Sequence, residues 1–308
     1  MASYNDEAMT TRDLDPPPAP QSLSLTTPTG DVFDLELRPL IAEEYPQCED
    51  LQRLTWGQNF NEVVPSSMLK IAHRLGGVVS GAFAPDGRLM GFVHGVTGVR
   101  GGELLHWSHM AAVRPELRGC GMGRHLKLYQ RREMLAIDCR IMEWTYDPLE
   151  SRNAHLNLNR LAGEPIEYVR NVYGDGSTSA LHQGIGTDRF IISWRLDDPD
   201  VEQVLENGPA PLADAVDNAP AVNTDANGRP FDEAELEGWE LPDVPVFLVE
   251  VPADIQTLKR DEPTVAKAWR AGTRKAFEAA LAAGYRIQRL KKNAADSRFF
   301  YVAETISR

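Results

Sequence analysis

The sequence predicts an α+β domain over the first two thirds of the chain and a smaller α/β domain after it. Apolar runs with strand alternation and runs with helical spacing follow one another in a mixed order. The turn Pro85-Asp86-Gly87 joins two expected strands directly, and a glycine-rich turn at 119–123 joins a strand to a helix. With 308 residues and 42% hydrophobic content, the chain can bury a sizeable core.

The composition argues against several classes of protein. The 45 acidic residues outnumber the 32 basic ones, which disfavours nucleic acid or an anionic membrane as a partner. No run of 18 apolar residues occurs, and the first residues include Asp6 and Glu7, so we expect neither a membrane span nor a secretory signal. The three cysteines have no metal-type spacing and are expected to be reduced thiols in the cytoplasm.

The first predicted elements follow a polar tail. Residues 1–30 are rich in Pro, Ser, Thr and Asp, and we expect them to be disordered. Apolar residues alternate with charged ones over 33–37, which predicts a half-buried strand. Helical spacing over 42–56 predicts a helix, and Pro65 opens a second helix that Gly76 and Gly77 close.

Three strands and a helix come next. The apolar segments 77–84 and 88–96 form a predicted hairpin, and 104–113 is the next strand. The run 124–138 lacks Gly and Pro and predicts a helix. Three apolar residues fall on one face of this helix, so it should pack on one side: Met122, Leu126 and Tyr129.

The predicted domain closes with one more helix and three strands. A buried strand at 140–146 precedes a short helix at 151–162. Two further strands, 166–173 and 189–196, are separated by a Gly/Ser/Thr loop at 174–186. The first domain is therefore predicted to span residues 31–198.

The rest of the chain divides into a connection and a small domain. Residues 199–243 are acidic and rich in Pro and Ala, which indicates an interdomain connection, and residues 244–308 form the second domain. Its expected elements are a strand at 244–251, one or two helices within 253–284, and strands at 285–290 and 298–304. This order repeats part of the first domain, which leaves open a degenerate second half of the same fold.

The glycine turn at 119–123 is the strongest functional signal. Glycines 119, 121 and 123 allow tight turning and leave backbone N–H groups bare at the positive end of a helix, which favours a phosphate. A P-loop would require Gly-Lys-Ser/Thr, but Gly123 precedes Arg124 and His125. A Rossmann fingerprint would require a third glycine at position 124. The segment 114–132 holds six basic residues against Glu116 alone, a basic island that suits a small polyanion.

The turn resembles a known cofactor loop. The pattern Arg/Gln-x-x-Gly-x-Gly/Ala is met by Arg118, Gly121 and Gly123 and is preceded by Val113-x-Pro115. It is similar to the acyl-coenzyme A pyrophosphate loop of the GNAT acetyltransferase superfamily. The resemblance implies a mixed, mostly antiparallel central sheet flanked by helices, in the element order expected for residues 31–198.

Three further runs resemble a narrower bacterial subgroup of predicted GNAT acyltransferases with an extra C-terminal domain. They are Asn153-Ala154-x-Leu156-Asn157, Tyr168-x-x-Asn171-x-Tyr173-Gly174 and Asp188-Arg189-Phe190. This likeness hints at amino-acid N-acylation.

The family resemblance also implies which residues bind acetyl-CoA or another acyl-CoA. The pyrophosphate would lie on Arg118, Gly119, Cys120, Gly121, Met122, Gly123 and Arg124, the pantetheine arm along Met110, Ala111 and Val113, and Asn153 would help to hold the cofactor. We expect no metal, because His106 and His109 are three residues apart on a strand and point to opposite faces. Cys120 could carry an acyl group covalently or simply fill space in the turn.

Catalytic roles are less sharply specified. His109 is at a position where some family members carry a catalytic base, although it could also line the cleft without acting. The helix position that commonly carries an acid tyrosine holds Asn159. Tyr168 or Tyr173 could replace that tyrosine or be structural, and a coenzyme A thiolate also leaves without an acid near neutral pH.

We therefore expect a cytoplasmic acyl-CoA-dependent N-acyltransferase that passes an acetyl or other short acyl group directly to a small-molecule amine, an amino acid being one candidate. The alternatives are an N-succinyltransferase acting on amino acids and a non-catalytic protein that senses acyl-CoA. Arg270 and Arg274 could pair with acidic residues or reach a substrate carboxylate. Nucleic acid and membrane partners are not expected, and homodimer formation is left open.

Overall fold

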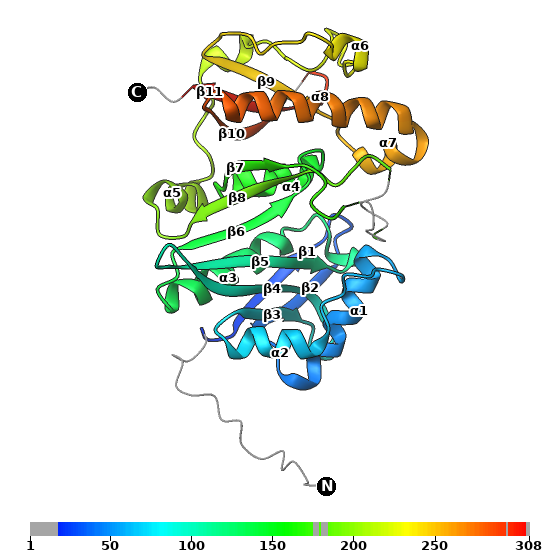
Figure 1. The fold of residues 1–308 in the computed structure, drawn as a ribbon. Helices are drawn as coiled ribbons and strands as arrows, with labels where there is room; N and C mark the ends of the chain where they lie inside the picture. The colour runs from blue at the N-terminus through cyan, green and yellow to red at the C-terminus, as the bar shows by residue number, and fades with distance from the viewer. Residues whose placement is uncertain (1–17, 175–178, 180–183, 294, 306–308) are drawn as a thin grey trace. The chain divides into compact units, whose positions relative to one another are not determined.

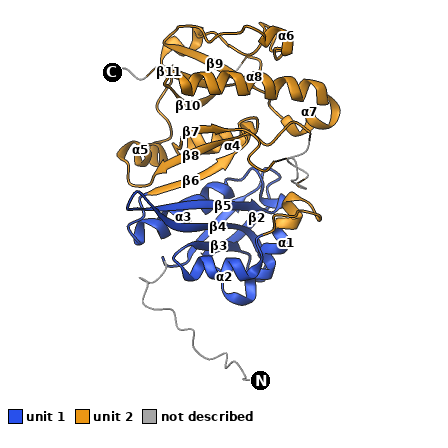
Figure 2. Cartoon of the chain, viewed as in Figure 1, with its two compact units in different colours: residues 1–51, 64–140 blue, residues 52–63, 141–308 orange. Residues whose placement is uncertain are grey.

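The computed structural model describes residues 18–174, 179, 184–293 and 295–305 (Figure 1). The first 17 residues of the predicted tail and most of the predicted loop 174–186 lie outside these residues. The chain divides into two compact units (Figure 2). Unit 1 comprises residues up to 51 and 64–140, and unit 2 comprises 52–63 and 141 onward. The division at 140 differs from the predicted boundary at 198.

Unit 1 contains five strands, each hydrogen-bonded antiparallel to the next one along the chain. They are β1 (Gln21–Thr26), β2 (Val32–Pro39), β3 (Val78–Phe83), β4 (Leu89–Arg100) and β5 (Glu103–Val113). The last four were predicted. β1 was not, because the tail was expected to extend to residue 30. Its short alternation of Ser and Leu pairs Leu23 with Leu35 and Leu25 with Phe33, and this pairing defines the strand.

Four helices of unit 1 occur where the sequence predicts helix: η1 (Ala42–Glu44), α1 (Tyr45–Trp56, which continues into unit 2), α2 (Ser66–Arg74) and α3 (Met122–Ala136). The short helix η2 (Pro115–Leu117) was not predicted. Helix α3 packs on β3, β4 and β5. The side chains of Met122, Leu126 and Tyr129 are each 1% exposed, so the predicted one-sided packing is confirmed.

From residue 141, unit 2 continues with a strand, helix, strand, strand segment. Its elements are β6 (Ile141–Tyr146), α4 (Ser151–Ala154), the π-helix η3 (His155–Arg160), β7 (Glu164–Val169) and β8 (Arg189–Arg195). The last strand, β8, lies between β6 and β7 and is antiparallel to both. The connection after it contains three short helices, α5 (Pro199–Asn207), η4 (Asp214–Asn218) and α6 (Glu233–Leu236).

The C-terminal segment repeats this connectivity. Its elements are β9 (Val246–Val251), α7 (Ile255–Asp261), α8 (Pro263–Ala282), β10 (Tyr285–Lys292) and β11 (Phe299–Thr305). Again the last strand, β11, lies between the other two and is antiparallel to both. The predicted order of this segment is confirmed, and together the elements give the chain the predicted α+β class.

Aromatic side chains join the two segments of unit 2. Phe190 on β8 lies 4.6 Å from the ring of Phe277 on α8, and Phe277 lies 5.0 Å from Tyr301 on β11. The Tyr301 hydroxyl donates to the carbonyl of Pro148 at 2.7 Å. Edge-to-face aromatic packing with satisfied hydroxyls is a strong core contact, and it explains why the boundary of the compact unit does not fall at 198.

None of the helices in the described ranges has both the length and the apolar character needed to cross a membrane.

Candidate functional site

The glycine turn connects β5 to α3 through two residues in left-handed conformation. Gly119 has φ +86° and Gly121 has φ +85°, and Gly121 is the N-cap of α3. L-residues rarely adopt such angles, so the first two glycines are required by the backbone. A Cβ at Gly121 would meet no atom within 4 Å, which shows open space beside the turn.

The backbone of this turn presents unused donors. The amide of Arg124 donates to the carbonyl of Gly121 at 2.9 Å, so hydrogen bonding within the helix starts there. Among the described residues, no backbone carbonyl accepts from the N–H groups of Gly119, Cys120 or Gly121. Both of these glycines are exposed. The turn therefore offers solvent-facing N–H groups at the positive end of a 15-residue helix.

The basic side chains around the turn differ in exposure and in their partners. Arg118 is exposed beside the glycines. Arg114 instead donates from Nε to the carbonyl of Leu89 at 2.7 Å, and Lys127 is buried. The predicted basic island is thus partly used for internal contacts. The Cys120 thiol donates to the carbonyl of Leu117, which agrees with the space-filling interpretation of this residue.

His109 lies in a β-bulge. His94 pairs with Met110 and Gly95 pairs with Ser108, which leaves His109 as the extra residue of β5. A bulge redirects the side chain and backbone of the unpaired residue. The His109 side chain is exposed at one side, and its ring meets the edge of the His94 ring at 6.0 Å. The protein atoms that surround the rest of the ring lower its pKa by burial.

The predicted pantetheine residues divide between the two faces of β5. Ala111 is exposed and Val113 half-buried, whereas Met110 is 8% exposed. His109, Ala111 and Val113 therefore share one face, and Met110 contributes only its backbone to that face. Met122 is likewise buried, so the turn shows its backbone and not its side chain.

A buried chain of hydrogen bonds lies on the opposite face of β5, and the sequence analysis missed it. The ammonium group of Lys127 donates to the Ser108 hydroxyl at 2.7 Å, which donates to Oε1 of Gln130 at 2.8 Å. The amide nitrogen of Gln130 then donates to Nε2 of His106 at 2.8 Å. The signal in the sequence is weak: Lys127 and Gln130 share an i, i+3 face of α3, and His106 and Ser108 share a strand face.

This chain of hydrogen bonds, the β5 relay, fixes the state of His106. Because Nε2 accepts, the proton is on Nδ1, which donates to the Thr97 hydroxyl at 2.9 Å, and Thr97 donates to the carbonyl of Gly76 at 2.8 Å. Burial, helped by the positive charge of Lys127, lowers the pKa of His106 to about 3, so the ring is neutral. A Cβ at Gly95 would overlap this ring. The relay therefore ties the strand beside the bulge firmly to α3.

The candidate tyrosines and Asn153 belong to unit 2. The Tyr168 hydroxyl donates to Oδ2 of Asp188 at 2.8 Å, and burial raises the pKa of Tyr168. Tyr173 is half-buried, and its ring lies 5.3 Å from the guanidinium of Arg189. Asn153 is exposed on α4. The hydroxyl of Tyr168 is thus committed to a carboxylate, whereas Tyr173 contacts a cation.

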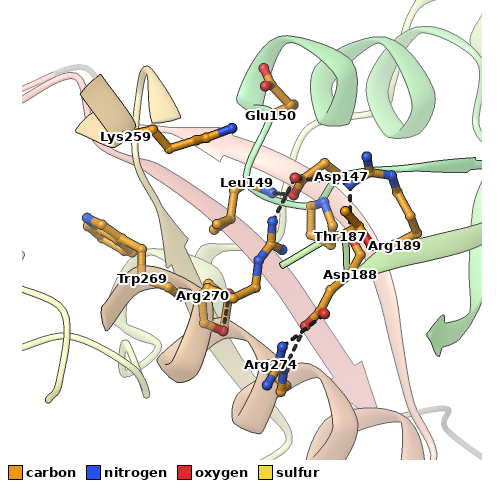
Figure 3. A network of polar contacts seen from close by, with 12 residues as sticks. Asp147, Leu149, Glu150, Thr187, Asp188, Arg189, Lys259, Trp269, Arg270 and Arg274 are labelled. Carbon is orange, nitrogen blue, oxygen red and sulfur yellow. Dashed lines mark hydrogen bonds and ion pairs between the residues drawn. The ribbon is translucent and has the colours of Figure 1, made fainter. Parts of the chain in front are cut away.

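Arg270 and Arg274, both on α8, form ion pairs with aspartates (Figure 3). Arg274 binds both oxygens of Asp188 at 2.7 and 2.9 Å. Arg270 binds Oδ2 of Asp147 at 2.7 Å. Of the two interpretations drawn from the sequence, the ion-pair interpretation is confirmed for these contacts.

Asn159 occupies the position where the family resemblance places a tyrosine, and its side chain forms hydrogen bonds with the backbone of β10. Its side-chain nitrogen donates to the carbonyl of Leu290 at 2.8 Å, and its oxygen accepts from the Leu290 amide at 2.9 Å. β10 is the first strand in the order of its three-stranded sheet, and it carries a bulge between Ile287 and Arg289. The amide therefore satisfies a peptide group at the edge of that sheet, a role that a tyrosine could not fill.

Among the described residues, no group of three or more His, Cys, Asp or Glu side chains is placed to hold a metal ion.

No protein-family model and no curated protein sequence matches this chain. Solved structures of acetyltransferases are similar to part of it. A putative acetyltransferase from Salmonella typhimurium with acetyl-CoA is 15% identical, with a TM-score of 0.43 over 58% of this chain and 98% of that one. A GNAT-family acetyltransferase from Streptococcus pneumoniae is 14% identical, with a TM-score of 0.41 over 52% and 98%. An Arabidopsis thaliana protein in complex with a coenzyme A–peptide bisubstrate analogue is 12% identical, with a TM-score of 0.41 over 52% and 97%.

Replacing Asn159 tests its structural role. Asn159→Ala leaves the N–H and C=O groups of Leu290 without their partner, so the free energy of unfolding should fall by about 2 kcal/mol. Urea denaturation followed by circular dichroism measures this. Asn153→Ala, an exposed asparagine on the preceding helix, should change it by less than about 0.5 kcal/mol. Equal effects of the two substitutions would contradict the role given to Asn159.

Proposed function

We propose that this chain is a cytoplasmic acyl-CoA-dependent N-acyltransferase of the GNAT type, which transfers an acetyl or other short acyl group to a small-molecule amine. The observation that carries the proposal is the turn at 119–121. Two glycines in left-handed conformation expose N–H groups, which no described backbone carbonyl accepts, at the start of a long helix that follows a bulged strand. This arrangement suits a diphosphate whose attached chain follows the strand.

The proposed binding mode uses both features. The N–H groups of the turn and Arg118 would hold the pyrophosphate, since the space beside Gly121 is open and no backbone carbonyl in the described ranges accepts from the N–H groups of residues 119–121. The pantetheine arm would follow the β5 face that carries Ala111 and Val113. Peptide N–H groups freed at the bulge would stabilise the oxyanion formed when the amine attacks. The acyl-CoA itself supplies the activated thioester.

His109 is the proposed general base. An attacking amine must lose a proton, and an imidazole with a lowered pKa is neutral and able to accept it at pH 7. Direct transfer in a ternary complex then needs no covalent enzyme intermediate, which is consistent with the thiol of Cys120 being engaged by a backbone carbonyl. The proposal needs no proton from Tyr168, whose hydroxyl already donates to Asp188, because a coenzyme A thiolate also leaves without an acid near neutral pH.

A second candidate is a protein that binds acyl-CoA without turnover. It is favoured by the structural use of Asn159 and by the commitment of the Tyr168 hydroxyl, which remove two positions for an acid. Among enzymatic variants, the acceptor is open between a small amine such as an amino acid and a peptide, and the acyl group between acetyl and succinyl.

Thiol release separates these functions. The purified protein, incubated with acetyl-CoA or succinyl-CoA and a panel of amino acids, other amines and peptides, should release coenzyme A only when an acceptor is present. Preference among donors and acceptors then identifies the variant. Saturable acyl-CoA binding without release under any combination would favour the sensor and reject the enzyme.

Gly121→Glu tests the cofactor loop. The carboxylate would occupy the open space and repel a diphosphate, so the affinity for coenzyme A should fall at least about 100-fold, a loss near 3 kcal/mol. Isothermal titration calorimetry measures this loss. Gly87→Glu is a matched control, because Gly87 also has positive φ and open surroundings but lies in the β3–β4 hairpin. Unchanged affinity in the Gly121 variant would remove the cofactor assignment.

His109→Gln tests the base. In the unchanged protein, kcat/KM should rise with pH through the lowered pKa of His109, below its ordinary value near 6.5, and then level off. The variant should lose this acidic limb and about 10²-fold in kcat. His155→Gln, an exposed histidine in unit 2, should keep it. An acidic limb that persists in the His109 variant would clear this histidine of the role.

A further inference from the structure

Two arginines of unit 2 bind one buried carboxylate, and a lysine lies near enough to interact with it electrostatically. Arg189 from β8 binds Oδ2 of Asp147 at 3.1 Å, and Arg270 from α8 binds the same oxygen at 2.7 Å. Burial is the largest influence on the pKa of Lys259 from α7 and lowers it. The charges of Asp147, Arg270 and Arg189 also affect this pKa, so Lys259 lies near them. We call Arg189, Lys259 and Arg270 the cationic cluster. Its three members come from three elements and surround Asp147 (Figure 3).

Arg270 has donors that no described residue accepts from. Its side chain is 3% exposed, and Nη2 donates to Asp147. Neither Nε nor Nη1 has an acceptor among the described residues. Leaving donors of a buried guanidinium unpaired is costly, and each such case requires an explanation. The other oxygen of Asp147 accepts from the Leu149 amide at 2.9 Å and not from Nε or Nη1 of Arg270.

The neighbouring carboxyl groups do not accept hydrogen bonds from Nε or Nη1 of Arg270. Glu150 accepts from the amide of Gln256, and burial raises the pKa of Glu150. Glu62 lies near Arg189, and burial raises its pKa more than Arg189 lowers it. Asp188 is saturated by Arg274, Tyr168 and the Asn171 amide. None of these groups accepts from the unused donors of Arg270.

We propose that Arg270 and the cationic cluster bind the carboxylate group of a small organic ligand. The guanidinium provides the unused donors, and Arg189 and Lys259 add positive potential in a partly desolvated setting. A carboxylate is favoured over phosphate because Asp147, Glu150 and Glu62 lie close by and repel a dianion more strongly than a monoanion. The inference concerns binding by unit 2 alone and does not depend on acyl transfer.

Calorimetric titration of the full-length protein with acetate, at constant ionic strength set with chloride, tests the proposal. Acetate should bind saturably and more tightly than inorganic phosphate. Arg270→Lys keeps the positive charge near Asp147 but removes the guanidinium donors, and the affinity for acetate should fall about tenfold, the loss expected for one hydrogen bond to a charged group.

A second variant guards against loss of folding in the first. Lys259→Gln leaves both arginines on Asp147 and should also weaken acetate binding several-fold, whereas Lys267→Gln, the same charge change at an exposed position of α8, should not. Thermal unfolding confirms that each variant is folded. The proposal is overturned if acetate shows no saturable binding, which would leave a buried water molecule as the partner of Arg270. It is also overturned if phosphate binds more tightly or if Lys259→Gln and Lys267→Gln behave alike.

Discussion

The first N–H groups of an α-helix have no partner within the helix, and this constraint organises unit 1 around the start of α3. Most proteins satisfy these donors with a capping side chain. Here the N-cap is Gly121, which has no side chain to offer, and the left-handed turn before it opens the donors to solvent. A helix end built in this way is suited to receive an anion from outside.

Buried hydrogen bonds between β5 and α3 fix the strand that leads into the turn. The β5 relay joins Lys127, Ser108, Gln130 and His106 in a single direction of donation, and each link is within 2.9 Å. Such a network holds strand and helix in one register. Because Ser108 precedes His109, the bulge is anchored from behind by α3 while its other face remains accessible. The relay and the proposed chemistry therefore occupy opposite faces of the same strand.

Unit 2 contains two buried aspartates whose arginine partners differ in how fully they are hydrogen-bonded. Asp188 is fully satisfied by Arg274 and Tyr168, and its pKa is lowered below its usual value against the opposing effect of burial. Asp147 is satisfied as well, but two donors of its partner Arg270 have no acceptor in the described part of the chain. The two ion pairs lie one turn apart on α8, on the surface where the two strand, helix, strand, strand segments pack together. The Asp188–Arg274 pair is therefore a structural contact, whereas the Asp147–Arg270 pair leaves guanidinium donors that could bind a ligand.

The sequence by itself determined the order of the elements and the position of the glycine turn, because alternation, helical spacing and glycine patterns are local properties of the chain. The strand at 21–26 escaped prediction because its alternation is short and follows a proline-rich segment, and only pairing with β2 defines it. Tertiary structure alone decided the rest of the candidate site. The bulge at His109, the burial of Lys127, the commitment of Tyr168 to Asp188 and the hold of Asn159 on Leu290 all depend on residues far apart in the chain. Hydrogen-bond partners of this kind are selected by packing, and packing has no local signature.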